Sequence, residues 1–203
     1  STHYKNKLNQ DYTISKFKYY VGKFIFKNST GKDYVSENYF LINEEEPLSK
    51  QIELSNIPFG TYNAIEFIIG IDSLHNCSGA QSGALDPING MFWAWNTGYI
   101  FLKLEGNSNS SPSPSGILEY HIGGYKQPTN CIRPIKINLT ENPLRVTPKT
   151  NIIELKTDAS ELLKTPTDID FSLIPVVSDS KNAELMADNY KNMFSILNIR
   201  NEN

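Results

Sequence analysis

Residues 13–27 (TISKFKYYVGKFIFK) place β-branched and aromatic side chains at every second position and show no stripe at helical spacing. This alternation is typical of a β-strand with one buried face. A long strand has to pair its backbone N–H and C=O groups with neighbouring strands. The segment therefore predicts a fold built on a β-sheet, with a bend in this strand at Gly22.

Strand patterns recur along most of the chain, and we predict further strands at 38–42, 50–56, 61–70, 92–105, 116–122, 132–139 and 151–156. Pro58 and Gly60 form a strong turn signal between two of them. A strand, a Pro-x-Gly turn and a Tyr-led strand are typical of immunoglobulin-like and transthyretin-like sandwiches. We therefore predict an all-β sandwich of this kind, with residues 1–203 forming a single domain.

Two segments depart from this pattern. Residues 72–91 are rich in Gly, Ser, Asn and Asp, which predicts a long loop insertion of a length that is usually functional or disordered. Residues 178–197 (SDSKNAELMADNYKNMFSIL) carry Leu, Met, Tyr and Phe at helical spacing, with Ser180 as a candidate N-cap. We expect one C-terminal helix there, with its apolar stripe packed on the sandwich.

Composition excludes several classes of protein. Nineteen basic residues against 22 acidic ones give a net charge of −3, so no nucleic-acid partner is expected. The longest apolar runs are far shorter than the roughly 20 residues of a membrane-spanning helix. Asn occurs 22 times, and the first residue is Ser1 rather than Met. These features favour an exported bacterial protein whose targeting segment has been removed.

The two cysteines, Cys77 and Cys131, fit one disulfide in an oxidising compartment. Cys77 lies in the long loop, and Cys131 follows the strand at 116–122, which is expected to end at the same side of the sandwich. Two unrelated thiols are the alternative. There is no CxxC motif or Cys/His cluster, so a structural zinc site is not expected.

The sequence lacks the common enzyme motifs, including G-x-S-x-G, H-E-x-x-H, the Walker loop and the Rossmann fingerprint, so we do not expect an enzyme. The long loop does offer oxygen ligands. Asp72, Asp86 and Asn89, with backbone carbonyls, form a candidate calcium site. The alternative is that Asp86-Pro87 and Asn89-Gly90 only make turns.

Among the histidines, His121 is of most interest because it lies within a predicted strand, whereas His75 lies in the long loop. Alternation puts His121 on the same strand face as Glu119. One interpretation is a core or edge histidine that is hydrogen-bonded to Glu105 or Glu119. The other is a functional imidazole.

The two tryptophans favour the functional interpretation. If 98–105 and 116–122 form a hairpin, His121 lies opposite residues 99–101, and Trp93 and Trp95 lie just beyond that end of the ladder. The long loop is expected at the same end. An aromatic plug in the core is the alternative, since Trp most often serves that role.

The stretch from GIDSLHNCSGAQSGALDPINGMFWAWNTGYIFLKLEG to EYHIGGY resembles the MbnP-like family, relatives of the methanotroph copper proteins MopE and CorA. The strings FKYYVGKF, IPFGTYNAIEF and ADNYKNMF extend the resemblance over nearly the whole chain. The resemblance implies a β-rich protein of the periplasm or cell surface, often anchored by lipid as an outer-membrane lipoprotein.

In copper-binding relatives, a tryptophan oxidised to kynurenine joins histidines at the copper ion, and in some of them a separate di-haem peroxidase-type partner performs the oxidation. The resemblance matches Trp93 or Trp95 to the oxidised residue and His121 to a histidine ligand. His75 is the candidate for a second histidine.

Our leading hypothesis is therefore an extracytoplasmic metal-binding protein, with copper as the metal. In it, Glu105 or Glu119 fixes the tautomer of His121, because a ligating imidazole usually donates its other N–H to a carboxylate or carbonyl. The alternative is a non-enzymatic lipoprotein interaction module that presents its long loop to a partner and binds no metal.

Overall fold

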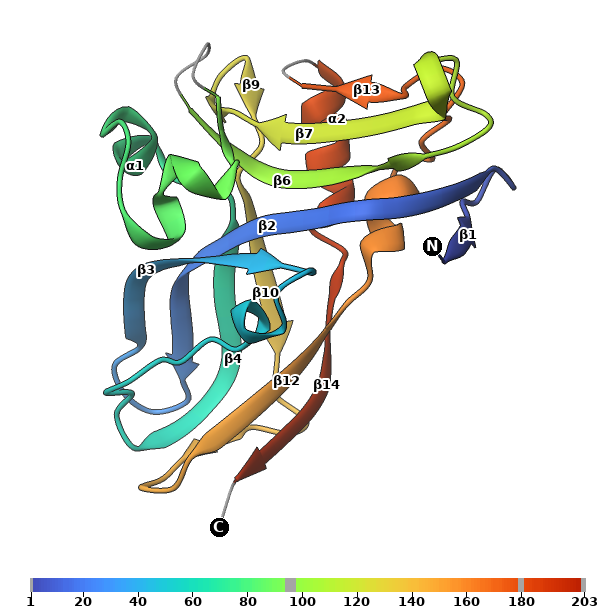
Figure 1. Cartoon of the computed structure of the whole chain (residues 1–203). Helices are drawn as coiled ribbons and strands as arrows, with labels where there is room; N and C mark the ends of the chain where they lie inside the picture. Colours follow the sequence, from blue (N-terminus) through green and yellow to red (C-terminus); the bar gives the residue numbers. More distant parts are fainter. Residues whose placement is uncertain (1, 94–97, 179–180, 202–203) are drawn as a thin grey trace.

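The computed structural model describes residues 2–93, 98–178 and 181–201, and within them the chain is mostly β (Figure 1). The strands are β1 (His3–Lys5), β2 (Asp11–Asn28), β3 (Tyr34–Asn43), β4 (Gly60–Ile69), β5 (Phe92–Trp93), β6 (Gly98–Asn107), β7 (Ile117–Gly123), β8 (Tyr125–Lys126), β9 (Thr129–Asn130), β10 (Arg133–Asn138), β11 (Leu144–Val146), β12 (Asn151–Thr157), β13 (Val176–Val177) and β14 (Phe194–Asn201). The α-helices are α1 (Ser73–Cys77) and α2 (Lys181–Tyr190). Short 3-10 turns lie at Pro47–Lys50, Gly83–Leu85, Pro87–Asn89, Pro114–Gly116 and Ala159–Leu163.

Strand β2 organises the large sheet, whose order is β10-β4-β2-β6-β7-β13, with β1, β3, β5 and β11 pairing alongside. The expected bend at Gly22 is a β-bulge, where the register with β3 shifts between Gly22 and Phe24 and Lys23 has a φ of 53°. A Cβ atom on Gly22 would collide with the ring of Tyr39. Glycine is required there because the backbone of β2 and a side chain of β3 approach so closely.

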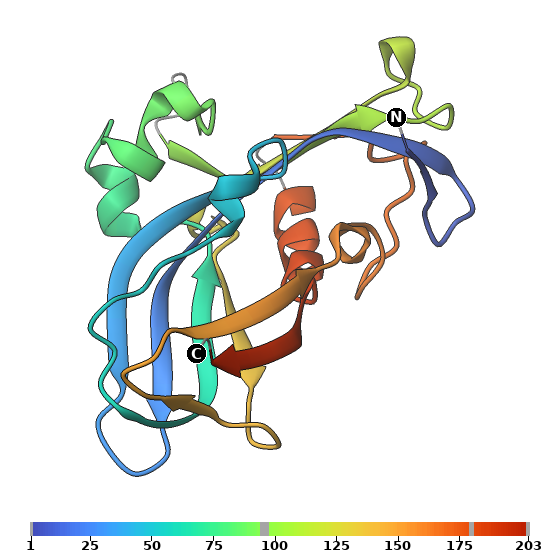
Figure 2. The same cartoon turned by 60° about the horizontal axis from the view of Figure 1, so that its bottom comes forward.

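The antiparallel β12–β14 ribbon faces the concave side of the large sheet, and the core lies between them (Figure 2). The ring of Phe194 on β14 packs edge-on against Phe67 on β4 at 5.1 Å and against Tyr19 on β2 at 5.8 Å. Helix α2 crosses behind β7 with Met186 and Tyr190 buried (Figure 1). The predicted all-β, sandwich-like fold with one C-terminal helix is confirmed.

The C-terminal helix is shorter than its apolar spacing predicted. It ends at Tyr190, and residues from Phe194 onward form β14, because pairing with β12 gives that segment a ladder and buries Met193. The candidate cap Ser180 lies outside the described residues. No helix in the described part of the chain is long and apolar enough to cross a membrane.

Two other expectations need correction. Residues 50–56 form no strand; Ile52 and Leu54 instead pack partly buried against the core without a ladder. The insertion at 72–91 is not plain loop, because α1 and two 3-10 turns occupy much of it. Figure 1 shows this insertion as a separate lobe beside the ends of β4, β5 and β6.

Candidate functional site

Strands β6 and β7 form the predicted hairpin, but in a different register. His121 lies opposite Lys103, not opposite residues 99–101. This register is set at the turn, where Asn107 lies opposite Ile117, and it runs without a shift to His121; a β-bulge between Ile100 and Leu102 comes only beyond that pair. This places His121 farther from the tryptophan end of the ladder than strict alternation predicts.

His121 lies between two carboxylates on the outer face of this hairpin. Its Nε2 is 2.9 Å from Glu105 Oε1, and its Nδ1 is 3.9 Å from Glu119 Oε1. One ligand atom from each of these three residues lies within 4.8 Å of the others. Across residues 2–93, 98–178 and 181–201, no other group of three His, Cys, Asp or Glu side chains does so.

Two lysines surround Glu105 in this cluster. Lys16 Nζ donates to Glu105 Oε2 at 2.9 Å, and Lys103 Nζ lies 3.9 Å from Oε1 while it donates to the carbonyl of Gly90 at 2.6 Å. Burial raises the pKa of Glu105, but the hydrogen bonds from Lys16 and His121 outweigh it and hold that pKa below its usual value. Glu105 is therefore a carboxylate at neutral pH. Lys16 could not be predicted from the sequence pattern, because its contact with Glu105 depends on the β2–β6 register.

The ring of Trp93 lies against β7 at Gly123. A Cβ atom on Gly123 would come within 2.6 Å of Trp93 Cζ3, so the ring fills the space above that glycine. Gly123 is two residues from His121, so the two positions share a strand face. Trp93 itself is buried, with 7% of its surface exposed. Trp95 lies outside the described residues.

His75 is held apart from this cluster, in the middle of α1. Its Nδ1 is 2.9 Å from Asp72 Oδ1, and the ring packs against Tyr39 with centroids 4.9 Å apart. Asp72 also caps α1 through the N–H of His75, and its Oδ2 lies 2.7 Å from Lys23 Nζ. Burial raises the pKa of Asp72, but the His75 N–H and Lys23 outweigh it, so the pKa lies well below its usual range. The structure does not bring His75 and His121 into one ligand group.

The three calcium candidates already have local structural roles. Asp72 caps α1, and Asp86 caps the 3-10 turn at Pro87–Asn89 by accepting from the N–H of Ile88. Asn89 Nδ2 donates to the carbonyls of Gly83 and Ala84. These are the contacts of turn-forming residues, and calcium binding at this loop stays a prediction.

The predicted disulfide is not formed, because Cys77 and Cys131 are both free in the structure. Cys77 is exposed, with its Sγ 3.5 Å from the hydroxyl of Tyr125. Cys131 is fully buried, and its N–H donates to the carbonyl of Gly124. Both cysteines therefore lie beside residues 124–125, as the sequence predicted. Cys77 is exposed to solvent, however, whereas Cys131 is buried in the core.

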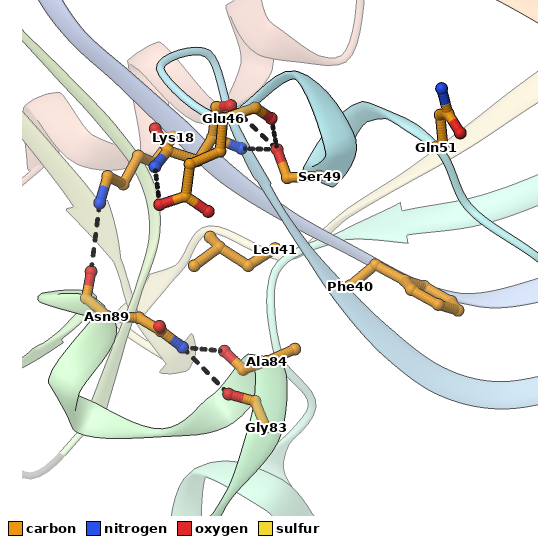
Figure 3. A pocket seen from close by; sticks show the side chains of 10 residues that line it. Lys18, Phe40, Leu41, Glu46, Ser49, Gln51, Gly83, Ala84 and Asn89 are labelled. Carbon is orange, nitrogen blue, oxygen red and sulfur yellow. Dashed lines mark hydrogen bonds between the residues drawn. The ribbon is translucent and has the colours of Figure 1, made fainter.

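A shallow pocket of about 300 Å³ lies between the end of β3 and the insertion (Figure 3). Figure 3 shows Lys18 reaching across it to the carbonyl of Asn89, at 3.4 Å, with Leu41 between the two walls. Asn89 belongs to both this pocket and the calcium prediction. Among the residues that the structure describes, neither Trp93 nor any histidine lines this pocket.

These observations define a mostly β protein with a histidine–carboxylate cluster beside a buried tryptophan. The chain belongs to the MbnP family, whose sequence profile matches residues 1–187. The solved structure of MbnP from Methylosinus trichosporium is similar, with a TM-score of 0.53, 18% sequence identity, and coverage of 87% of this chain and 73% of that one. At this identity the likeness shows the fold alone. Comparison with curated protein sequences gave no match.

Proposed function

We propose that this chain is an extracytoplasmic copper-binding protein, in which His121 and a kynurenine derived from Trp93 or Trp95 hold the ion. The observation that carries the proposal is the placement of the Trp93 ring over Gly123, on the strand face of His121. Family membership supports it, because the resemblance to the MbnP-like family matches these same residues to the copper site of its relatives. The same resemblance supports a periplasmic or surface location with a lipid anchor.

The donor atoms explain why oxidation is required. Unmodified tryptophan offers only an N–H donor and no useful metal ligand. The described residues around His121 supply one imidazole and two carboxylates, with no second soft donor. Conversion of the indole to kynurenine opens the ring, releases one carbon, and leaves an aromatic amine and a ketone oxygen. The residues present therefore suit copper after oxidation better than before it.

Glu105 supports this role by orienting the imidazole. Its Oε1 accepts a hydrogen bond at 2.9 Å from Nε2 when that atom carries the proton, which leaves the Nδ1 lone pair of His121 available to a ligand. Lys16 holds the other oxygen of Glu105 in place. We assign His121 as the ligand and Glu105 as its orienting partner.

A separate oxidising partner of the di-haem peroxidase type is part of this proposal. Trp93 is largely buried and carries out no redox chemistry by itself, so the oxidising equivalents have to be delivered from outside. The insertion at 72–91 lies beside β5, which carries Trp93, and is the surface at which such a partner would approach (Figure 1).

Mass spectrometry of the peptide spanning residues 91–103 tests the oxidation. Protein made without an oxidising partner should carry both tryptophans intact and take up little copper. After exposure to a peroxidase-type oxidase, one tryptophan should exchange a carbon for an oxygen, and copper uptake should rise in proportion to the modified fraction. Equal copper uptake by modified and unmodified protein would refute the proposal.

The second candidate is an interaction module without metal. Leu74 and Ile88 on the insertion are 72% and 87% exposed, so both large apolar side chains are available for contact with a partner. If this function is correct, oxidised protein takes up no copper, and replacing Leu74 and Ile88 with Ser leaves the fold intact but abolishes partner binding.

A further inference from the structure

The two carboxylates beside His121 face each other across the β6–β7 ladder. Glu105 pairs directly with Glu119, and like charges at directly opposite positions of an antiparallel pair are destabilising. Lys16 and Lys103 both lie on the Glu105 side. Among the described residues, the ion-pair contact of the Glu119 carboxylate is with His121 Nδ1 at 3.9 Å. Glu119 therefore lacks the close lysine contact that Glu105 has, although the charge of Lys103 acts on both carboxylates.

A surface recess of about 230 Å³ gives access to both carboxylates. It is lined by Glu105 and Glu119 together with the polar residues Ser15 and Asn107. An ion that reaches the cluster from this recess can keep water molecules in its open coordination positions. Three protein ligands with open positions are the arrangement of solvent-accessible zinc sites.

We propose that the unmodified chain binds a divalent transition-metal ion of the zinc class through His121, Glu105 and Glu119. The inference goes beyond the copper function because it requires no oxidised tryptophan. One imidazole with two carboxylates suits zinc and its neighbours, whereas Mg²⁺ and Ca²⁺ prefer all-oxygen sites. Glu119 is the least buried of the three and can move to close the 3.9 Å gap to His121.

Lys16 sets the limit on affinity in this proposal. Its ammonium group already occupies Glu105 Oε2 at 2.9 Å, so a bound cation shares that carboxylate with a positive charge. Removing the lysine charge should therefore strengthen metal binding. A purely structural role for the cluster predicts no such gain.

Calorimetric titration with Zn²⁺ tests the site, using protein whose tryptophans are shown intact by mass. We expect one ion per chain, with affinity reduced about tenfold or more in His121→Ala and Glu119→Gln. Lys16→Gln should bind more tightly. Glu66→Gln, a carboxylate on β4 with its own lysine partners, is the matched control and should bind as the wild type does.

Circular dichroism of each variant separates lost binding from lost folding. Glu119→Gln is the decisive variant, because the Glu119 side chain is 45% exposed and its replacement should leave the fold intact. Absence of zinc binding at millimolar concentration, or binding unchanged in Glu119→Gln, would overturn the proposal, as would equal binding of Mg²⁺. The titration uses unoxidised protein and no copper, so its failure would leave the copper function standing, whereas zinc binding by a chain that takes up no copper after oxidation would contradict the copper function alone.

Discussion

The ring of Trp93 lies directly over Gly123, which leaves no room for a side chain at position 123. A Cβ atom there would come within 2.6 Å of both Trp93 Cζ3 and the carbonyl oxygen of Tyr99. The tryptophan can tilt, but the carbonyl belongs to the paired strand β6 and cannot move freely. This contact fixes the ring on the strand face that carries His121.

Gly123→Ala should therefore destabilise the fold by about 1–3 kcal/mol, the usual cost of overpacking a filled core. Urea unfolding monitored by tryptophan fluorescence measures both the stability and the environment of the displaced ring. Gly31→Ala is the control, because a Cβ there meets only the Asn28 side chain at ordinary contact distance. Equal stability of the two variants would show that Trp93 does not rest on residue 123.

Asp158 provides a pH-dependent contribution to stability. It follows the last residue of β12 and caps the 3-10 turn at Ala159–Leu163 by accepting from the N–H and hydroxyl of Ser160. The Ser160 hydroxyl is the largest cause that lowers the pKa of Asp158 below 3.8, outweighing burial. A lowered folded-state pKa gives stability that is full above the unfolded-state pKa and is lost as pH falls through the folded-state value.

Asp158→Ala should cost about 1 kcal/mol at pH 7, the typical loss of an N-cap. The difference from wild type should shrink below about pH 3.8, where the carboxylate begins to take up a proton. Denaturant unfolding at pH 7 and pH 3 measures it. A difference of the same size at both pH values would show that the charge of Asp158 plays no part.

The two free cysteines should differ sharply in reactivity. Cys77 is exposed, whereas burial raises the pKa of the Cys131 thiol to about 12. A maleimide reagent should label one thiol per folded chain and two after denaturation without reductant. If the denatured, unreduced protein shows no reactive thiol, Cys77 and Cys131 form a disulfide after all.

Much of the fold followed from alternation, since strands near 13–27, 61–70 and 132–139 lie where period-two patterning predicted them. Segment 50–56 has the same patterning but finds no partner strand, because alternation describes one strand and says nothing about its neighbours. The opposite error concerns the segment from Phe194 onward, which was predicted as helix and is a strand. Its apolar spacing fits both structures, and pairing with β12 decides for the strand.

The site was predictable in its members but not in its geometry. His121 and Glu119 share a strand face by parity, and Glu105 was named with them as a hydrogen-bond partner, but its place on the neighbouring strand depends on the register. The start of the ladder at Asn107 and Ile117 makes Lys103 the partner of His121, and the polar loop between the two strands carries no sequence signal for that register. His75 is instead held by Asp72, which also contacts Lys23 of β2, and this contact between distant segments leaves no sequence signal.

The most direct test of the copper proposal is the copper content of protein in which kynurenine has been verified by mass. Wild-type protein and Glu66→Gln should each retain about one copper ion per chain after dialysis against a competing chelator, while equally oxidised His121→Ala should retain none, because one strong nitrogen ligand has been removed. Copper retained by oxidised His121→Ala at the wild-type level would contradict the account.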